Sequence, residues 1–392
     1  MNQPSFKELL SPQVLAMPPS GIRKFFDYTS GMKDVISLGV GEPDFVTPQI
    51  VRDACNVALE KGRTSYTSNS GIPELREAIA EYFHTQFEVA YEPSNEVLVT
   101  VGSSEALDLA FRALITEGDE ILIPEPCYIS YSPIVYLSGG KPVAVETCAH
   151  DQFKLTAEAL REKLTSRSKV VVLCYPNNPT GAIMTYDDWL PIAKLVEERN
   201  LIVISDEIYA ELTYSGDKHV SFASLPGMKD RTLLISGFSK AFAMTGWRVG
   251  YACGHRELIS AMLKIHQYTV MCAPNISQVA ALASLQVGME EKDLMIASYN
   301  QRRRAFVHGL RQIGLPCHEP LGSFYAFPSI AHTGLSSERF AQRLLQEAKV
   351  VTVPGLVFGS VGEGFIRCSY ASSQVQLDEA LDRIQDFLNH HL

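Results

Sequence analysis

Four short segments of the sequence combine residue types that carry covalent and acid–base chemistry. Residues 236–250, SGFSKAFAMTGWRVG, follow an apolar stretch typical of a buried strand and contain one lysine and one arginine. A lysine at the end of such a strand is unfavourable unless it has a use. Burial and a neighbouring cation, here Arg248, lower the pKa of an amine and make it nucleophilic. Lys240 is therefore a candidate for Schiff-base chemistry; the alternative is a lysine that reaches solvent from the strand end.

Two further segments follow apolar stretches and place polar side chains where each strand would end. In residues 175–181, YPNNPTG, Asn178 can offer an amide from a turn. In residues 205–209, SDEIY, Asp206 lies at the same sheet edge and Tyr209 follows three residues later. Ligands of open α/β sheets bind at this edge, and a buried carboxylate needs a partner such as a protonated ring nitrogen. The plainer interpretations are a simple turn for Asn178 and a helix cap for Asp206.

The fourth segment, residues 102–107 (GSSEAL), predicts an anion site at the start of a helix. Gly102 permits a tight turn out of the preceding strand. Ser103 and Ser104 present hydroxyl and backbone N–H groups at a helix N-terminus, which favours anions. An ordinary N-cap role for Ser104 is compatible with this interpretation.

Six apolar runs predict the strands that position these segments. They are rich in Val, Ile and Leu with little alternation, as expected for a sheet covered on both faces. Helical patterns lie between them, so we expect a mostly parallel α/β sheet. The runs are residues 97–101, 120–123, 143–146, 170–174, 202–205 and 233–236.

The pattern changes after about residue 290 and predicts a smaller α+β domain. A long helix is expected over residues 293–313, and Arg367 lies in the last of three later strands, where the plain interpretation is a surface arginine. The length of 392 residues fits two domains. We predict an N-terminal arm with part of the small domain (1–45), a large domain (46–288) and a small C-terminal domain (289–392). The later elements are strands 324–327, 350–353 and 364–369 and helices 337–348 and 376–388.

Composition excludes several classes of protein. With 34 Lys and Arg against 44 Asp and Glu, the net charge is −10, which argues against nucleic-acid binding but not against a local basic pocket. The eight cysteines form no C-x-x-C pair and no zinc-ligand spacing with histidine, so we expect no metal site and free thiols in a reducing compartment. No signal peptide or bilayer-spanning run is evident. The sequence predicts a cytoplasmic protein without membrane partners.

Together, and in this order, the four segments resemble the fold-type I enzymes that use pyridoxal 5'-phosphate, specifically the class I/II aminotransferases. The resemblance runs from residues 36–45 (ISLGVGEPDF) to 365–370 (FIRCSY). Residues 41–45 and 243–248 are similar to the branch containing prokaryotic aspartate aminotransferases. Residues 20–24, 266–268 and 276–278 are most similar to the bacilli-type aminotransferase A group, regarded as N-acetyl-L,L-diaminopimelate aminotransferases of lysine biosynthesis.

The resemblance implies a role for each matched residue. Lys240 would hold the cofactor as a Schiff base and, once released by substrate, act as the general base. Asp206 would keep the pyridine nitrogen protonated. The other residues implied to contact the cofactor are Asn178 and Tyr209 at its phenolic oxygen, Tyr128 stacked on its ring, and Ser103, Ser104, Ser239 and Arg248 at its phosphate.

Substrate and partner contacts are implied as well. Arg367 would form a bidentate pair with the substrate α-carboxylate, and the backbone N–H of Gly41 would approach the same group. Tyr66 would reach across a homodimer interface to the partner's phosphate, so that the two active sites are shared. Ile22 would lie on an arm that closes over the substrate, and Arg23 on that arm is a candidate ligand for a distal carboxylate.

Two departures from the family pattern stand out. Gly237 replaces a serine that many relatives use as a phosphate ligand, and Ser239 or Ser236 would compensate. Ser104 stands where some prokaryotic aspartate aminotransferases have a lysine for the distal carboxylate. The resemblance favours an aminotransferase that uses the glutamate/2-oxoglutarate pair and an N-acetylated acceptor; the alternatives are an aspartate or aromatic aminotransferase or a C–S β-lyase. A ligand-sensing domain of a transcription regulator is a further alternative on this fold, and the charge and the short stretch before Ser20 oppose it.

Overall fold

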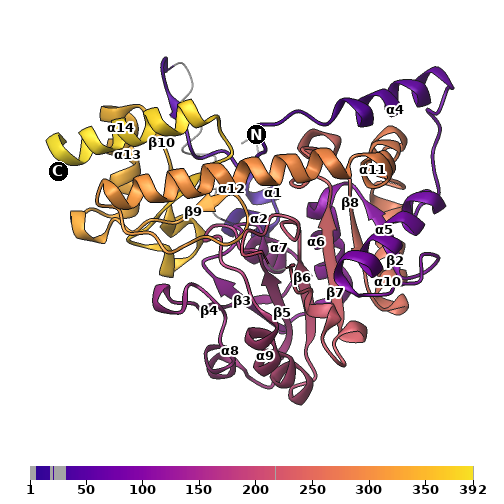
Figure 1. The fold of residues 1–392 in the computed structure, drawn as a ribbon. Helices are drawn as coiled ribbons and strands as arrows, with labels where there is room; N and C mark the ends of the chain where they lie inside the picture. The colour runs from indigo at the N-terminus through magenta and orange to yellow at the C-terminus, as the bar shows by residue number, and fades with distance from the viewer. Residues whose placement is uncertain (1–5, 18–20, 22–31, 217, 392) are drawn as a thin grey trace, which may run out of the picture.

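A seven-stranded sheet forms the centre of the larger part of the molecule in this computed structural model, which describes residues 6–17, 21, 32–216 and 218–391 (Figure 1). The strand order is β2-β8-β7-β6-β5-β3-β4. The four pairs among β3 to β7 are parallel, and β8 runs antiparallel to both of its neighbours. The predicted mostly parallel α/β fold is confirmed. The strands are β2 (Val97–Thr100), β3 (Glu120–Glu125), β4 (Lys141–Glu146), β5 (Ser168–Cys174), β6 (Ile202–Asp206), β7 (Thr232–Gly237) and β8 (Gly250–Cys253).

One sequence expectation about this sheet was wrong, and one strand was not predicted. β4 was expected to be buried, but it is the edge strand, and of its six residues only Val145 is buried. β8 was not predicted, because the sequence Gly-Tyr-Ala-Cys has no run of branched apolar residues. It is nevertheless buried, between β2 and β7.

Helices cover both faces of the sheet and explain why its strands are apolar throughout. Along β5, Val170 and Val172 pack into a cluster with α6 and α7, whereas Val171 and Leu173 pack on the opposite face with α8 and α9. Alternate side chains of a strand thus enter two cores. The helices of this part are α4 (Gln49–Glu60), α5 (Pro73–Phe87), α6 (Gly102–Leu114), α7 (Tyr131–Leu137), α8 (Ala157–Lys163), α9 (Tyr186–Glu198), α10 (Arg256–Thr269) and α11 (Asn275–Val287).

The C-terminal part joins three helices to two small sheets. β12 (Ile366–Ser369) lies between β11 (Val353–Pro354) and β9 (Tyr325–Ala326), antiparallel to both. β1 (Ile36–Ser37) pairs in parallel with β10 (Val350–Val351), which ties the N-terminal part of the chain to this region. The long helix α12 (Met289–Gln312) starts earlier than expected and runs along one side of both parts (Figure 1). The other helices are α13 (Ser337–Ala348) and α14 (Gln374–His391).

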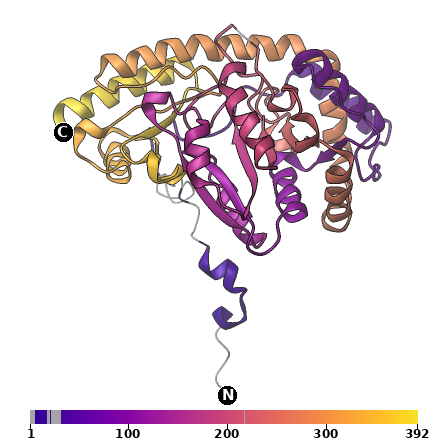
Figure 2. The same ribbon diagram turned by 90° about the horizontal axis from the view of Figure 1, so that it is seen from below.

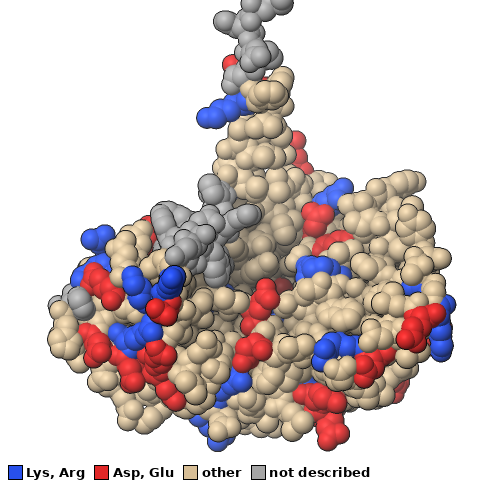
Figure 3. Space-filling model, turned by 90° about the horizontal axis from the view of Figure 1, so that it is seen from above, with Lys and Arg blue, Asp and Glu red and all other residues tan. Residues whose placement is uncertain are grey.

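Near the N-terminus, α1 (Phe6–Leu9) and α2 (Pro12–Ala16) extend away from the rest of the molecule (Figure 2). None of their residues is buried. Of the helices in the described ranges, none combines the length and apolarity needed to span a bilayer. On the face shown in Figure 3, basic and acidic side chains are interspersed and do not gather by sign.

Candidate active site

A cavity of about 520 Å³ opens at the carboxyl ends of β5, β6 and β7. It is lined by eleven of the residues that the sequence singled out. The fold therefore brings together side chains that lie up to 326 positions apart in the chain. These eleven are Gly41, Ser103, Ser104, Tyr128, Asn178, Asp206, Tyr209, Ser239, Lys240, Arg248 and Arg367.

Lys240 lies three residues beyond the end of β7, and its amine is enclosed by the cavity wall. Nζ donates a hydrogen bond to the carbonyl oxygen of Gly41 at 2.5 Å. Burial, helped by the cations Arg367 and Arg248, lowers the pKa of this amine to about 8 against the opposing effects of Glu42 and Asp206. A lysine in this environment is available as a neutral nucleophile near neutral pH.

Asp206 is the last residue of β6 and is 4% exposed. Its Oδ2 accepts a hydrogen bond from the Tyr131 hydroxyl at 2.6 Å, and its Oδ1 accepts one from the backbone N–H of Ile208 at 3.3 Å. Burial raises the pKa of this carboxyl to about 6, although the bond from Tyr131 opposes the shift. The chain forms a turn over residues 208–211, shortly after Asp206, and not a helix, so the helix-cap interpretation is wrong.

Tyr131 and Tyr325 are site residues that the sequence analysis missed. Tyr131 begins α7 and is 1% exposed, and Tyr325 in β9 has its hydroxyl 3.0 Å from that of Tyr209. Both line the cavity. A tyrosine inside a helix or strand pattern carries no sequence signal of where its hydroxyl points, because packing decides that.

The start of α6 and the Arg248 side chain form the basic end of the cavity. Arg248 has a left-handed backbone (φ 52°), and a Cβ added to Gly102 would lie 2.7 Å from its Nη2. A Cβ at Gly250 would lie 2.5 Å from the backbone nitrogen of Ser103, so both glycines permit this close approach. N–H groups and hydroxyls at a helix N-terminus beside a guanidinium can bind a phosphate.

The two serines near Gly237 lie in different places. Ser239 lines the cavity, whereas the Ser236 hydroxyl donates to the carbonyl oxygen of Glu207 at 3.2 Å and does not reach the cavity. A Cβ at Gly237 would lie 2.9 Å from the Cα of Gly250. Of the two proposed replacements for the missing serine, only Ser239 is therefore placed to contact a ligand.

Arg367 in β12 is 3% exposed, so the interpretation as a surface arginine is wrong. Its Nη1 donates to Asn178 Oδ1 at 3.0 Å and its Nη2 to the Gly39 carbonyl oxygen at 2.7 Å. Its Nε is buried and has no hydrogen-bond partner among the described residues. The guanidinium also lies over the ring of Tyr325, 4.4 Å from the centroid. A buried, oriented guanidinium with a donor to spare is suited to a carboxylate ligand.

Asn178 reaches the cavity because its neighbour holds the turn. Asn177 Nδ2 donates to the Cys174 carbonyl oxygen at 3.2 Å, and Asn177 Oδ1 accepts from the backbone and hydroxyl of Thr180. With the turn fixed in this way, Asn178 lines the cavity beside Arg367. The segment is thus both a turn and part of the site.

The remaining predicted site residues are Tyr66, Ile22 and Arg23. Tyr66 is 80% exposed and does not line it. Ile22 and Arg23 lie outside the described residues.

Comparisons with known proteins agree with this geometry. A family model, aminotransferase class I and II, matches residues 33–384. The chain is 53% identical to a putative aminotransferase, YugH, of Bacillus subtilis, covering 97% of this chain and 98% of that protein. An aspartate aminotransferase of Pyrococcus abyssi is 44% identical (94% and 96% covered), and a probable N-acetyl-LL-diaminopimelate aminotransferase of Bacillus subtilis is 42% identical (97% and 96%). A solved structure of a Pyrococcus protein superposes with a TM-score of 0.94 at 43% identity, covering 96% of this chain and 98% of that one. This chain belongs to the class I and II aminotransferases, which are transferases dependent on pyridoxal 5'-phosphate.

Proposed function

We propose that the cavity around Lys240 is the aminotransferase active site and that Lys240 carries the cofactor. The observation behind this proposal is that a partly buried amine, a buried carboxylate and a buried guanidinium share one cavity. Each of these groups is costly to bury without a partner of opposite character. The amine can react with an aldehyde, the carboxylate can pair with a basic ring nitrogen, and the guanidinium can bind the carboxylate of an amino acid. The basic end of the same cavity can bind a phosphate.

The residues present fit pyridoxal phosphate. Lys240 offers an amine with a lowered pKa, and Asp206 is a carboxyl whose protonated form is favoured by burial and which a cationic ring nitrogen would hold ionised. Ser103, Ser104, Ser239 and Arg248 offer phosphate contacts at the basic end. When bound, the cofactor ring supplies the electron sink that stabilises negative charge at the substrate Cα.

The protein residues transfer the proton and position the substrate and the cofactor. Lys240 Nζ, once free, accepts the proton from the substrate Cα and returns it during transfer of the amino group. Arg367 binds the α-carboxylate and, with the Gly41 backbone, fixes the Cα–H bond next to that amine. Tyr128 would hold the cofactor ring from one face, and Asn178 and Tyr209 would donate hydrogen bonds to its phenolic oxygen.

We further propose a homodimer in which Tyr66 completes the partner's phosphate site. Tyr66 is exposed although it is large and aromatic, and its loop is held by a hydrogen bond from Asn275 to the Ser65 carbonyl oxygen at 3.1 Å. A broad hollow beside Arg248, lined in part by Val46 and Trp247, is open to receive a neighbouring chain. Exposed aromatic and apolar groups around a hollow are typical of an interface. The free thiols of all eight cysteines support a cytoplasmic location for this dimer.

For the substrate, we propose an N-acetylated amino-oxopimelate as acceptor and glutamate as donor, in lysine biosynthesis. The support is a relative of that printed function. The described lining of the cavity has Lys240, Arg248 and Arg367 as its cations, and all three are assigned to the cofactor or the α-carboxylate. Aspartate, glutamate and the N-acetylated acceptor each carry a second carboxylate, for which the sequence candidate is Arg23, outside the described residues.

Borohydride reduction of the holoenzyme followed by peptide mass analysis tests the cofactor assignment. The cofactor mass should appear on Lys240 and not on an exposed lysine such as Lys264. A label on another residue, or none, would refute the assignment. A half-reaction screen that follows conversion of the cofactor to its amine form then identifies the donor and acceptor. Release of pyruvate from cystathionine without an oxo acid would instead favour the C–S β-lyase.

The role of Arg367 is tested by Arg367→Lys. The substitution keeps the charge but loses the fork geometry that pairs with a carboxylate. We expect KM for amino donors to rise about tenfold or more while the cofactor stays bound. Unchanged donor kinetics would remove Arg367 from the substrate site.

A further inference from the structure

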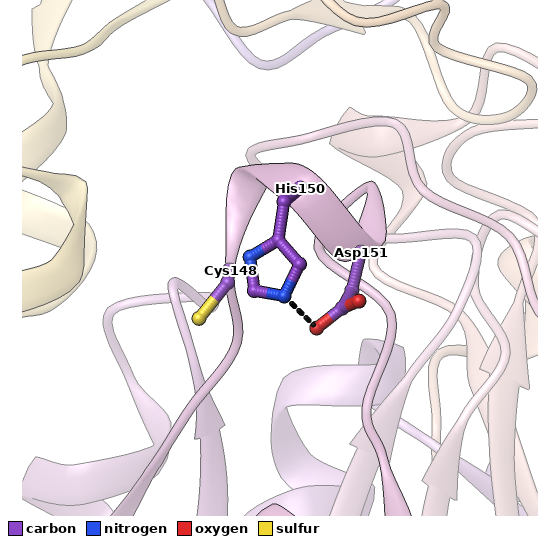
Figure 4. Close-up of side chains that lie close together, drawn as sticks. All are labelled: Cys148, His150 and Asp151. Atoms are coloured by element: carbon purple, nitrogen blue, oxygen red, sulfur yellow. Dashed lines mark ion pairs between the residues drawn. The ribbon is translucent and has the colours of Figure 1, made fainter.

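A cluster of three possible metal ligands lies outside the catalytic cavity, on the turn that follows the edge strand β4. Cys148 precedes a short 3-10 helix, η1 (Ala149–Asp151), which contains His150 and Asp151. One ligand atom from each of the three residues lies within 4.8 Å of the others. Figure 4 shows the His150 ring between the Cys148 sulfur and the Asp151 carboxylate, on the same side of the turn. None of the three lines the catalytic cavity.

The 4.8 Å within which these atoms lie is about 1 Å wider than the spacing of zinc ligands. Zn–S distances of about 2.3 Å and Zn–N distances of about 2.0–2.1 Å place tetrahedral ligand atoms roughly 3.3–3.6 Å apart. His150 Nε2 and Asp151 Oδ2 are already 3.0 Å apart. The thiol of Cys148 is exposed, so rotation of its side chain can close the remaining gap without disturbing the core.

The backbone of the turn is held from both ends, so the ligands start from a defined arrangement. The Cys148 carbonyl oxygen accepts hydrogen bonds from the backbone N–H of Phe153 at 2.8 Å and of Asp151 at 3.2 Å. Phe153 is 3% exposed and packs edge-on against the rings of Phe327 and Phe365. An anchored turn loses little conformational freedom when a metal binds.

The donor set selects the class of metal. A thiolate, an imidazole and a carboxylate suit Zn²⁺ and its neighbours in the transition series, whereas Mg²⁺ and Ca²⁺ prefer oxygen ligands alone. We propose that Cys148, His150 and Asp151 bind one Zn²⁺ ion, with water as the fourth ligand. The thiol proton is released to solvent on binding. The sequence expectation of no metal rested on pairs of cysteines, and this cluster uses only one.

The test uses the holoenzyme without an affinity tag, with Co²⁺ as the spectroscopic probe. The visible d–d bands of tetrahedral Co²⁺ should saturate at one equivalent, and Zn²⁺ but not Mg²⁺ should remove them. Cys148→Ser, His150→Ala and Asp151→Asn should each weaken Co²⁺ binding about tenfold or more. Cys272→Ser, which changes a partly exposed cysteine outside the cluster, is the matched control and should bind like the wild type.

A second readout is thermal stability. One equivalent of Zn²⁺ should raise the melting temperature of the wild type and of Cys272→Ser but not that of Cys148→Ser. Because the three ligands are on the surface, their variants should fold, and any one of them is sufficient for the test. Absence of saturable binding, or binding that survives Cys148→Ser or His150→Ala, would overturn the proposal.

Discussion

At the scale of single residues, burial brings the pKa values of Lys240 and Asp206 closer to each other. It lowers the pKa of Lys240 to about 8 and raises the pKa of Asp206 to about 6. The same desolvation that makes the amine nucleophilic therefore makes the carboxylate costly to keep ionised. The cofactor-free protein has a destabilised site, and a bound cation at Asp206 would remove part of that cost.

Asp206→Asn should therefore stabilise the cofactor-free protein at pH 8 while reducing transamination at least about a hundredfold. Between pH 3.8 and about 6 the native carboxyl binds more protons than the unfolded one, so wild-type stability falls as the pH rises through this window. Above pH 6 the wild type has lost up to about 3 kcal/mol of its free energy of unfolding in this way. The asparagine variant does not titrate at this position and keeps that free energy. Urea unfolding of both cofactor-free proteins at pH 4 and pH 8 measures the difference in their free energies of unfolding. An equal difference in stability at the two pH values would contradict the prediction.

The titration of Lys240 gives a second prediction. With a pKa near 8, about one amine in ten is neutral at pH 7, against roughly one in three thousand at the ordinary value of 10.5. Acylation of Lys240 by a small anhydride in the cofactor-free protein should rise with pH and reach half its maximum near pH 8. Peptide mass analysis follows it, with exposed lysines of the same sample as the reference. A midpoint near pH 10 would show that the cavity does not depress the pKa.

At the scale of elements, the anion site depends on how closely β8 approaches the start of α6. A Cβ at Gly250 would lie 2.5 Å from the Ser103 backbone nitrogen, so Gly250→Ala must push α6 away from Arg248. We expect cofactor affinity to fall about tenfold or more, because N–H groups and the guanidinium would no longer converge. Equilibrium dialysis of the cofactor measures the change.

Gly254→Ala is the control for this prediction. Gly254 follows the other end of β8, and its added Cβ would lie 3.0 Å from a Leu233 methyl group, far along the strand from the helix start. It should lower the melting temperature with little effect on cofactor affinity. Similar losses of affinity in both variants would point to general destabilisation instead.

These elements also mark how far the sequence could predict the site. Runs of branched apolar residues identified six strands, and segments at their ends identified part of the cavity lining, including Asn178, Asp206 and Lys240. Gly41, Tyr128 and Arg367 were named as site residues only from the resemblance to the family. The edge position of β4 and the existence of β8 depend on which strands pair, which a local pattern does not encode. Tyr131 and Tyr325 were missed for a related reason: their hydroxyls reach the site only through the packing of α7 and β9.

At the scale of the whole molecule, the net charge of −10 coexists with a cavity whose three described cations face inward. The acidic balance opposes large polyanions, and the interspersed charges on the face of Figure 3 offer them no basic patch there. Small anions are bound by local geometry instead. In the proposed dimer the local geometry of the anion site would include the partner chain, because each chain would contribute an exposed tyrosine to its partner's anion site.

Hybrid dimers give the last prediction. Lys240→Ala should remove transamination, and Tyr66→Ala should weaken cofactor binding about tenfold, so each pure dimer is impaired at low cofactor concentration. In a mixed dimer, one site combines the intact Lys240 of one chain with the intact Tyr66 of the other. Unfolding and refolding the two variants together should therefore restore cofactor binding and activity to about half of the sites in each mixed dimer. If Tyr66 acts within its own chain, the mixture will show no gain over the separate proteins, and the shared-site dimer is refuted.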